Sequence, residues 1–275
     1  MPSDLPLSRR AALRRLAFGT LGASGLCALA ACKDRYAEPL AGRDGENGHL
    51  RARPGTPTQS VAAGITPLGI GPARGESRDG VLYVPASYTG ATPVPLVLLF
   101  HGATGNAREV LPALQAQADA RGFVIVAPDS RRATWDLSYQ ALDWDVAFAD
   151  LALAWAFDRV RVDAARCFIA GFSDGASYAL SLGVTNGDLF RGMIGFSPGY
   201  LDPGTPRGMP RAFMSHGLND TVLDIDLCSR RIAVALRTNG YDLTYHEFEG
   251  GHTVPVAMRE AAGEWMANAE LRAAG

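Results

Sequence analysis

The stretch CFIAGFSDGASYAL, residues 167–180, places one serine between two glycines as Gly171-Phe172-Ser173-Asp174-Gly175. The pattern G-x-S-x-G is typical of a nucleophilic serine on a tight turn that joins a strand to a helix. An apolar run precedes Ser173, and a helical pattern begins at Gly175, so the surroundings fit this turn. The sequence therefore predicts that Ser173 is a nucleophile.

A serine hydroxyl is a weak nucleophile unless a base accepts its proton and an acid orients that base. The chain has five histidines. His252 lies in the glycine-rich loop EGGHTVP after the last apolar run, and it fits the order serine, acid, histidine both in sequence and in position. His101 directly follows an earlier apolar run, and we expect it to fix its loop. His246 lies inside a predicted strand. The sequence thus favours His252 as the base.

The acid that best fits this order is Asp220, in the stretch HGLND that follows the run RAFMS. A loop at the end of one strand and a loop at the end of the next can converge at one edge of a parallel sheet. Asp224 and Asp226 are alternatives, although their place before a helical run suits helix capping.

Acyl transfer also needs donors for the negative oxygen of the tetrahedral intermediate. We expect one donor to be the backbone N–H of Asp174, the residue after the nucleophile. The other is expected from the loop HGATG, where the Ala103 N–H is the best candidate. A carboxylate beside such a site would repel the charge, so the Asp174 side chain is expected to point away from it.

The elements that must position these residues alternate along the chain. Apolar runs of four to seven residues, typical of buried strands, occupy 81–84, 95–100, 122–128, 167–172, 192–197, 211–216 and 243–248. Helical patterns lie at 107–121, 145–159 and 256–267, with Asp145 placed as an N-cap. Such alternation predicts an α/β fold with a mostly parallel sheet and helices on both faces.

Composition places the chain among globular proteins with one main domain. It has 275 residues, 47% of them hydrophobic, and a formal net charge of −2. No basic stripe is present, so nucleic acid is not an expected partner. Serine-based ester cleavage would need neither a metal nor an organic cofactor.

The first residues are typical of a targeting segment. Two arginine pairs precede a short apolar stretch, so residues 1–31 are predicted to be a signal peptide, with some similarity to twin-arginine signals. The end LAAC resembles a bacterial lipobox, which predicts a lipid anchor on Cys32 and attachment to the membrane of the cell envelope, periplasmic or at the outer membrane. A plain signal peptide cut near Ala31 is the alternative.

The remaining chain is predicted to divide into two parts. Residues 32–77, rich in Gly, Pro, Arg and Ala, are predicted to be a flexible tether, and residues 78–275 the catalytic domain. Within that domain, Cys167 and Cys228 could pair in an oxidising compartment. Their spacing does not bring them together, which favours two buried free thiols.

The stretches LLFHGATG, APDS, GFSDGA, HGLND and GGHT, taken in order, resemble the alpha/beta-hydrolase superfamily over about residues 78–270. Within it the chain is most similar to the serine esterases of the phospholipase/carboxylesterase and polyhydroxybutyrate-depolymerase-like groups. The resemblance implies a Ser173–Asp220–His252 triad with oxyanion donors at Ala103 and Asp174. Asp174 is a departure, because those groups often carry Gln, Asn or Ala after the nucleophile.

The connections between the predicted strands limit the substrate. Only residues 197–210 separate two of the apolar runs, so a large lid domain is not expected there, and short acyl or aryl esters are favoured. The roomy loop 130–144 carries Trp135 and Tyr139, which could wall a substrate pocket or pack against the core. A thioesterase or peptidase with the same triad, or a non-catalytic envelope binding protein on this fold, are the alternative functions.

Overall fold

A computed structural model describes residues 48–139 and 141–271. The predicted signal peptide and the proposed lipid site Cys32 lie outside these residues. Within the described ranges, no helix is long and apolar enough to cross a membrane.

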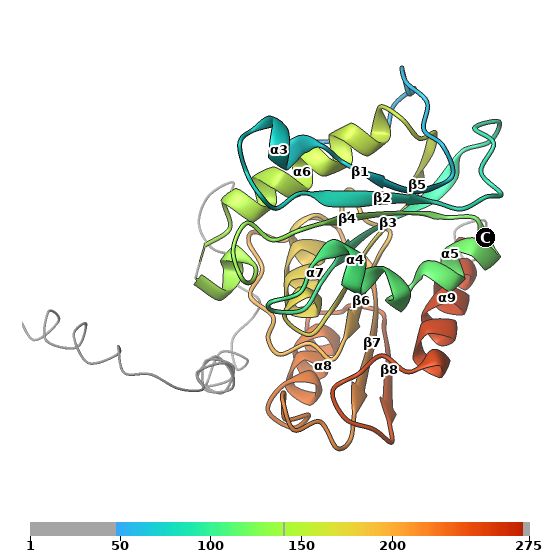
Figure 1. Cartoon of the computed structure of the whole chain (residues 1–275). Helices are drawn as coiled ribbons and strands as arrows, with labels where there is room; N and C mark the ends of the chain where they lie inside the picture. The colour runs from blue at the N-terminus through green and yellow to red at the C-terminus, as the bar shows by residue number, and fades with distance from the viewer. Residues whose placement is uncertain (1–47, 140, 272–275) are drawn as a thin grey trace, which may run out of the picture.

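The core of the fold is an eight-stranded sheet with the order β1-β2-β4-β3-β5-β6-β7-β8 (Figure 1). β1 and β2 pair antiparallel with each other, β2 pairs antiparallel with β4, and all further pairs are parallel. This confirms the predicted α/β class, and the fold is that of an α/β hydrolase. The strands are β1 (Gly64–Pro67), β2 (Gly80–Val84), β3 (Val94–Phe100), β4 (Val124–Pro128), β5 (Val162–Phe172), β6 (Gly192–Phe196), β7 (Arg211–Gly217) and β8 (Leu243–Phe248).

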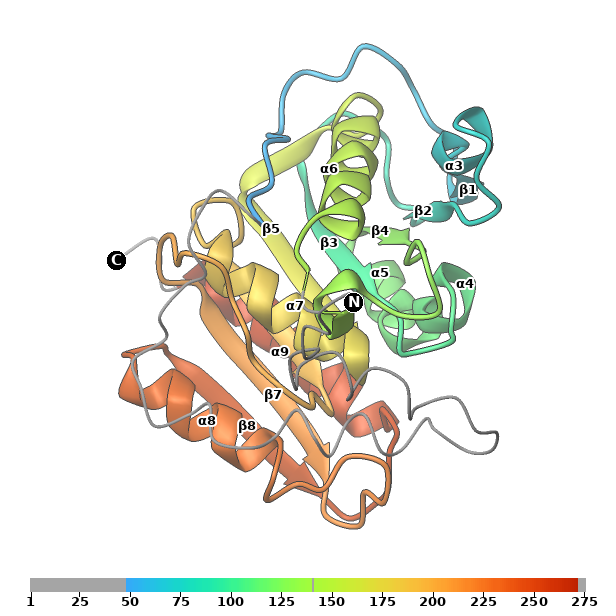
Figure 2. The same ribbon diagram turned by 90° about the vertical axis from the view of Figure 1, so that its left-hand side faces the viewer.

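Helices cover both faces of the sheet. One face carries α6 (Trp144–Phe157), α7 (Asp174–Thr185) and α8 (Ser229–Thr238), and the other carries α4 (Ala107–Val110), α5 (Gln115–Arg121) and α9 (Val256–Leu271) (Figure 2). A short helix, α3 (Ile70–Ala73), follows β1. Within β3, Leu96, Leu98 and Phe100 join the first apolar core and Val97 and Leu99 the second. This alternation is why a doubly covered strand is apolar throughout.

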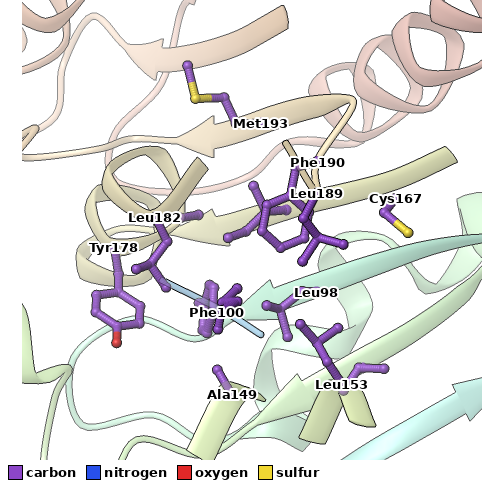
Figure 3. Packing of buried hydrophobic residues seen from close by; sticks show 14 of the residues in the cluster. Leu98, Phe100, Ala149, Leu153, Cys167, Tyr178, Leu182, Leu189, Phe190 and Met193 are labelled. Atoms are coloured by element: carbon purple, nitrogen blue, oxygen red, sulfur yellow. The ribbon is translucent and has the colours of Figure 1, made fainter. Parts of the chain in front are cut away.

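The first apolar core lies between the sheet and helices α6 and α7. Figure 3 shows Leu98 and Phe100 of β3 facing Tyr178 of α7 and Ala149 and Leu153 of α6. Packing of this kind fixes where α7 begins and therefore where the turn before it lies.

The two cysteines of the domain are both buried and are not joined to each other. Cys167 lies in β5, where burial raises the pKa of its thiol to about 12. The thiol is therefore an apolar packing group at neutral pH.

Two predicted helices differ in detail from the structure. The helix predicted at 107–121 is divided into α4, a 3₁₀ turn at Leu111–Ala113 and α5. Pro112 lies at this division, where it cannot donate the N–H that a continuous helix needs. Asp145 does not cap its helix: α6 begins at Trp144, and the Asp145 carboxylate accepts the backbone N–H groups of Arg131 and Asp136.

The boundary predicted at residue 77 is wrong for the described part of the tether. Leu50 is buried in the first core, β1 adds an edge strand to the sheet, and Leu50 donates its N–H to Asn186 of the α7 C-cap. Residues 48–77 therefore belong to the domain. The segment has no apolar period of its own, and its contacts come from residues about a hundred positions later, which is why local patterns do not reveal them.

Candidate active site

Ser173 lies on the turn between β5 and α7. Its backbone has φ 58° and ψ −123°, in the left-handed region that non-glycine residues seldom adopt. The flanking glycines make the turn possible: a Cβ on Gly171 would lie 2.1 Å from the Gly175 carbonyl oxygen, and one on Gly175 would lie 2.3 Å from the His101 carbonyl oxygen. Both spacings are impossible for a side chain, so the G-x-S-x-G glycines are required by close packing.

A hydrogen-bonded chain of three side chains runs from Ser173. His252 Nε2 lies 2.7 Å from Ser173 Oγ, and His252 Nδ1 lies 2.6 Å from Asp220 Oδ2. The serine hydroxyl donates to Nε2, and Nδ1–H donates to the carboxylate, because a carboxylate can only accept. The structure therefore brings together the three residues that the sequence singled out.

The loop after β7 holds the Asp220 carboxylate in place. Oδ1 accepts the backbone N–H groups of Val222 and Leu223, both at 2.9 Å, and the side chain is fully buried. A Cβ on Gly217 would lie 2.4 Å from the carbonyl oxygens of Gly250 and Gly251, so the Asp220 and His252 loops are in direct contact.

Neither of the two alternative acids reaches His252. Asp224 Oδ1 accepts the N–H groups of Asp226 and Leu227 and so closes the turn before α8, whereas the N-cap of α8 itself is Cys228. Asp226 pairs with Arg230 one helical turn further on, at 2.8 Å.

A second histidine contacts the acid. His216 Nε2, at the end of β7, lies 3.2 Å from Asp220 Oδ2. No role was predicted for His216 from the sequence. Its position at the end of a predicted strand, four residues before Asp220, was the signal that could have suggested one.

The loop after β3 also comes close to Ser173. A Cβ on Gly102 would lie 3.3 Å from Ser173 Cβ, so this loop passes directly over the serine. Among the hydrogen bonds of the described residues, the backbone N–H groups of Ala103 and Asp174 have no acceptor. Two unpaired N–H groups, one after Ser173 and one in this loop, are what an oxyanion site requires.

His101 has the structural role expected of it. Its Nε2 accepts the Ser130 N–H at 3.0 Å, and its Nδ1–H donates to the Gly102 carbonyl oxygen at 2.7 Å. Burial lowers the pKa of His101, so the ring is neutral and can act as donor and acceptor at once. His101 thereby fixes the loop that carries Ala103.

The Asp174 side chain is engaged by two other loops. Its carboxylate accepts hydrogen bonds from the hydroxyls of Thr134, Ser138 and Tyr200, the last two at 2.8 Å and 3.0 Å. Burial raises the pKa of Asp174, partly offset by the hydroxyls of Ser138 and Tyr200. The carboxylate therefore ties the loop 130–144 and the segment after β6 to the first turn of α7.

A small cleft of about 260 Å³ opens beside the serine, lined by residues 101–105, Glu109, Val110 and Phe172. Trp135 does not line it: its side chain is 0% exposed, stacks on Tyr178 and donates its Nε1–H to the His101 carbonyl oxygen. The prediction of Trp135 as a pocket wall is therefore wrong, because the loop folds inward and its largest apolar side chain joins the core. Tyr139 is 46% exposed and lies under the Arg132 guanidinium, outside the residues that line the cleft.

Comparison with known proteins identifies the class. The Esterase family model matches residues 72–223, which is more than half of the chain and includes Ser173 and Asp220. The chain belongs to the Esterase family, within the α/β-hydrolase superfamily. It is therefore an ester hydrolase. No curated protein matches the chain.

Several solved structures share the fold. Esterase PE8 is 22% identical, with a TM-score of 0.56 over 70% of this chain and 98% of its own. The carboxylesterase of Bacillus cereus is 22% identical, with a TM-score of 0.53 over 70% and 95%. A phospholipase/carboxylesterase of Dyadobacter fermentans is 16% identical, with a TM-score of 0.54 over 76% and 99%.

Proposed function

We propose that this esterase is a serine hydrolase that works through an acyl-enzyme, with Ser173 as nucleophile, His252 as base and Asp220 as the orienting acid. The observation that carries the proposal is the continuous chain from Ser173 Oγ through His252 to Asp220 Oδ2, at 2.7 Å and 2.6 Å. Both distances lie within hydrogen-bond reach, as proton transfer requires.

The proposed reaction has two matching halves. Ser173 Oγ attacks the ester carbonyl carbon while its proton passes to His252 Nε2, and the carbonyl oxygen becomes negative. The N–H groups of Ala103 and Asp174 stabilise that oxygen. The intermediate then breaks its C–O bond, and the leaving alcohol takes the proton from His252. Water attacks the acyl-enzyme by the same route, which releases the acid and restores the serine.

The substrates we propose are short acyl or aryl esters. The cleft beside Ser173 is small, at about 260 Å³, and the segment between β6 and β7 contains no helix that could form a lid. Hydrolysis rates on nitrophenyl esters of increasing acyl length should fall beyond short chains. A maximum on long chains in emulsions would contradict this part of the proposal.

A fluorophosphonate probe tests the nucleophile. Wild-type protein should be labelled at one site, and Ser173→Ala should lose both labelling and esterase activity, the latter by at least about a thousandfold. Ser177→Ala is the matched control, because this serine lies one turn further along α7 and hydrogen-bonds within the helix and to the Gly199 N–H. Labelling that survives in Ser173→Ala would rule out Ser173 as the nucleophile.

We also propose that the enzyme is exported and anchored to the cell envelope through a lipid on Cys32. The lipobox-like end of the apolar N-terminal stretch supports this. Incorporation of a labelled fatty acid should occur in cells that express the full chain and disappear in Cys32→Ala. Equal incorporation in both would refute the anchor.

A further inference from the structure

His216 lies at the carboxyl end of β7 and is completely buried. Its two ring nitrogens have different surroundings. Nε2 lies 2.9 Å from the Leu223 carbonyl oxygen and 3.2 Å from Asp220 Oδ2. Nδ1 lies 2.5 Å from the hydroxyl of Ser229, the first residue of α8. Every polar atom of the ring is therefore in contact with a partner.

These contacts fix the position of the proton on the ring. A carbonyl and a carboxylate can only accept, so the proton is on Nε2, which donates it to the Leu223 carbonyl oxygen with Asp220 Oδ2 close by. Nδ1 is then an acceptor, and Ser229 must donate to it. The other acceptor near the Ser229 hydroxyl, the Pro198 carbonyl oxygen, is further away at 3.4 Å. Burial lowers the pKa of His216, which keeps the ring neutral and preserves this arrangement.

We propose that His216, held in one tautomer by Ser229, is a positioning residue for Asp220: its Nε2–H donates to the Leu223 carbonyl oxygen and lies beside the Asp220 carboxylate. The inference rests on the triad proposed above. Leu223 in turn donates its N–H to Asp220 Oδ1, so His216 connects the loop of the catalytic acid to the start of α8.

The nearby N–H of His216 affects the charge of the catalytic acid. Asp220 Oδ2 accepts the hydrogen bond from His252, and the polar Nε2–H of His216 lies 3.2 Å from the same oxygen, where it stabilises the negative charge. The remaining charged group that faces His216 is Glu247, its neighbour on β8, which forms an ion pair with Arg230 of α8. Removing the His216 N–H should therefore leave Asp220 holding the His252 imidazolium more tightly and in a less defined orientation.

The test compares His216→Leu with His216→Gln in the full protein. Leucine fills the space without a donor, whereas the glutamine amide can place an N–H where Nε2 lies. We expect His216→Leu to lose kcat about tenfold with little change in KM, and the acid limb of kcat/KM against pH to rise by about half a unit. His216→Gln should keep the wild-type limb and most of kcat. His246→Gln, on the adjacent strand β8, is the matched control and should leave the profile unchanged.

Each outcome separates this inference from the proposed function. Wild-type protein that is not labelled by fluorophosphonate would remove the triad itself. Labelled wild type with equal losses in His216→Leu and His216→Gln, and an unmoved acid limb, would reduce His216 to a packing residue. If His216→Leu does not fold, Ser229→Ala decides, because it removes only the group that fixes the tautomer. A partial rise of the acid limb supports the inference, and an unchanged profile overturns it.

Discussion

At the scale of the residue, the turn that presents the Ser173 hydroxyl requires a residue without a side chain at position 175. A Cβ on Gly175 would collide with the carbonyl oxygens of Phe100 and His101. These carbonyls end β3 and begin the loop that carries Ala103. The nucleophile and the proposed oxyanion donor are therefore held by the same contact, and a change at Gly175 should affect both.

Gly175→Ala should consequently lower activity and stability together. The added Cβ would lie 2.3 Å from a backbone oxygen, so β3 or α7 must shift, at a cost of about 2 kcal/mol in the free energy of unfolding. We expect kcat/KM to fall at least about tenfold because the Ala103 N–H moves with its loop. Kinetics and urea unfolding would measure both. Gly55→Ala is the control, since no atom lies within 4 Å of its added Cβ. Wild-type kinetics in Gly175→Ala would contradict the argument.

Single residues could be predicted from sequence where their chemistry imposes an order and a position. Ser173, Asp220 and His252 follow three strands in the required order, so order and strand ends sufficed to select them. Trp135 could not be placed in this way, because the choice between a pocket wall and the core depends on Tyr178 and Phe100, which pack against it from distant segments.

At the scale of the element, the loop between β4 and α6 is held together by two buried carboxylates, those of Asp136 and Asp145. Asp136 Oδ2 accepts the Asp145 N–H at 3.0 Å, and Asp145 Oδ2 accepts the Asp136 N–H at 2.7 Å. This reciprocal pair holds the segment that supplies Thr134 and Ser138 to Asp174. Burial, together with the charge of Asp136, raises the pKa of Asp145 from its ordinary value of 3.8 to about 7.

A raised carboxyl pKa makes stability depend on pH with a definite sign. Between pH 4 and 7 the folded state holds a proton on Asp145 that the unfolded state has lost, so this group's contribution to stability declines as pH rises. Asp145→Asn should therefore be less destabilising at pH 8 than at pH 5, by about 2 kcal/mol. The buried rings of His101 and His216 have lowered pKa values and act in the opposite direction, but equally in both proteins.

Urea unfolding of wild type and Asp145→Asn at both pH values would measure the difference. Asp226→Asn is a suitable control, because the Asp226 side chain lies in the turn before α8 and is 70% exposed. A constant gap between wild type and Asp145→Asn from pH 5 to 8 would show that Asp145 is ionised throughout.

The order of the strands and helices was predictable because strands covered on both faces are apolar throughout. The hydrogen bonds that hold a loop together from within leave no comparable pattern in the sequence. Asp145 illustrates the difference: its place before an apolar helix suits an N-cap, yet the backbone of the preceding loop takes its carboxylate. Local propensity was outweighed by contacts that exist only once the loop has folded.

At the scale of the whole molecule, the segment 48–59 binds to helices α6 and α7, which lie about a hundred or more residues later in the sequence. Asn186, at the end of α7, accepts the Leu50 N–H and donates to the Gly48 carbonyl oxygen, each at 2.8 Å. Asp150 and Asp158, on and just after α6, accept N–H groups from residues 51, 52, 58 and 59. The segment thus spans the ends of α6 and α7 away from the catalytic turn, which lies at the start of α7.

Leu50→Ala should therefore separate stability from catalysis. Leu50 is 1% exposed within the first core, so its truncation should lower the free energy of unfolding by about 3 kcal/mol. Ser173 precedes the twelve residues of α7, about 18 Å of helix, so kcat/KM of the folded enzyme should stay within about twofold of wild type. Val234→Ala, 61% exposed on α8, should change neither quantity by much. Unaltered stability in Leu50→Ala would show that the segment 48–59 unfolds independently of the domain. A loss of kcat/KM at full stability would show instead that the segment affects the catalytic turn through α7.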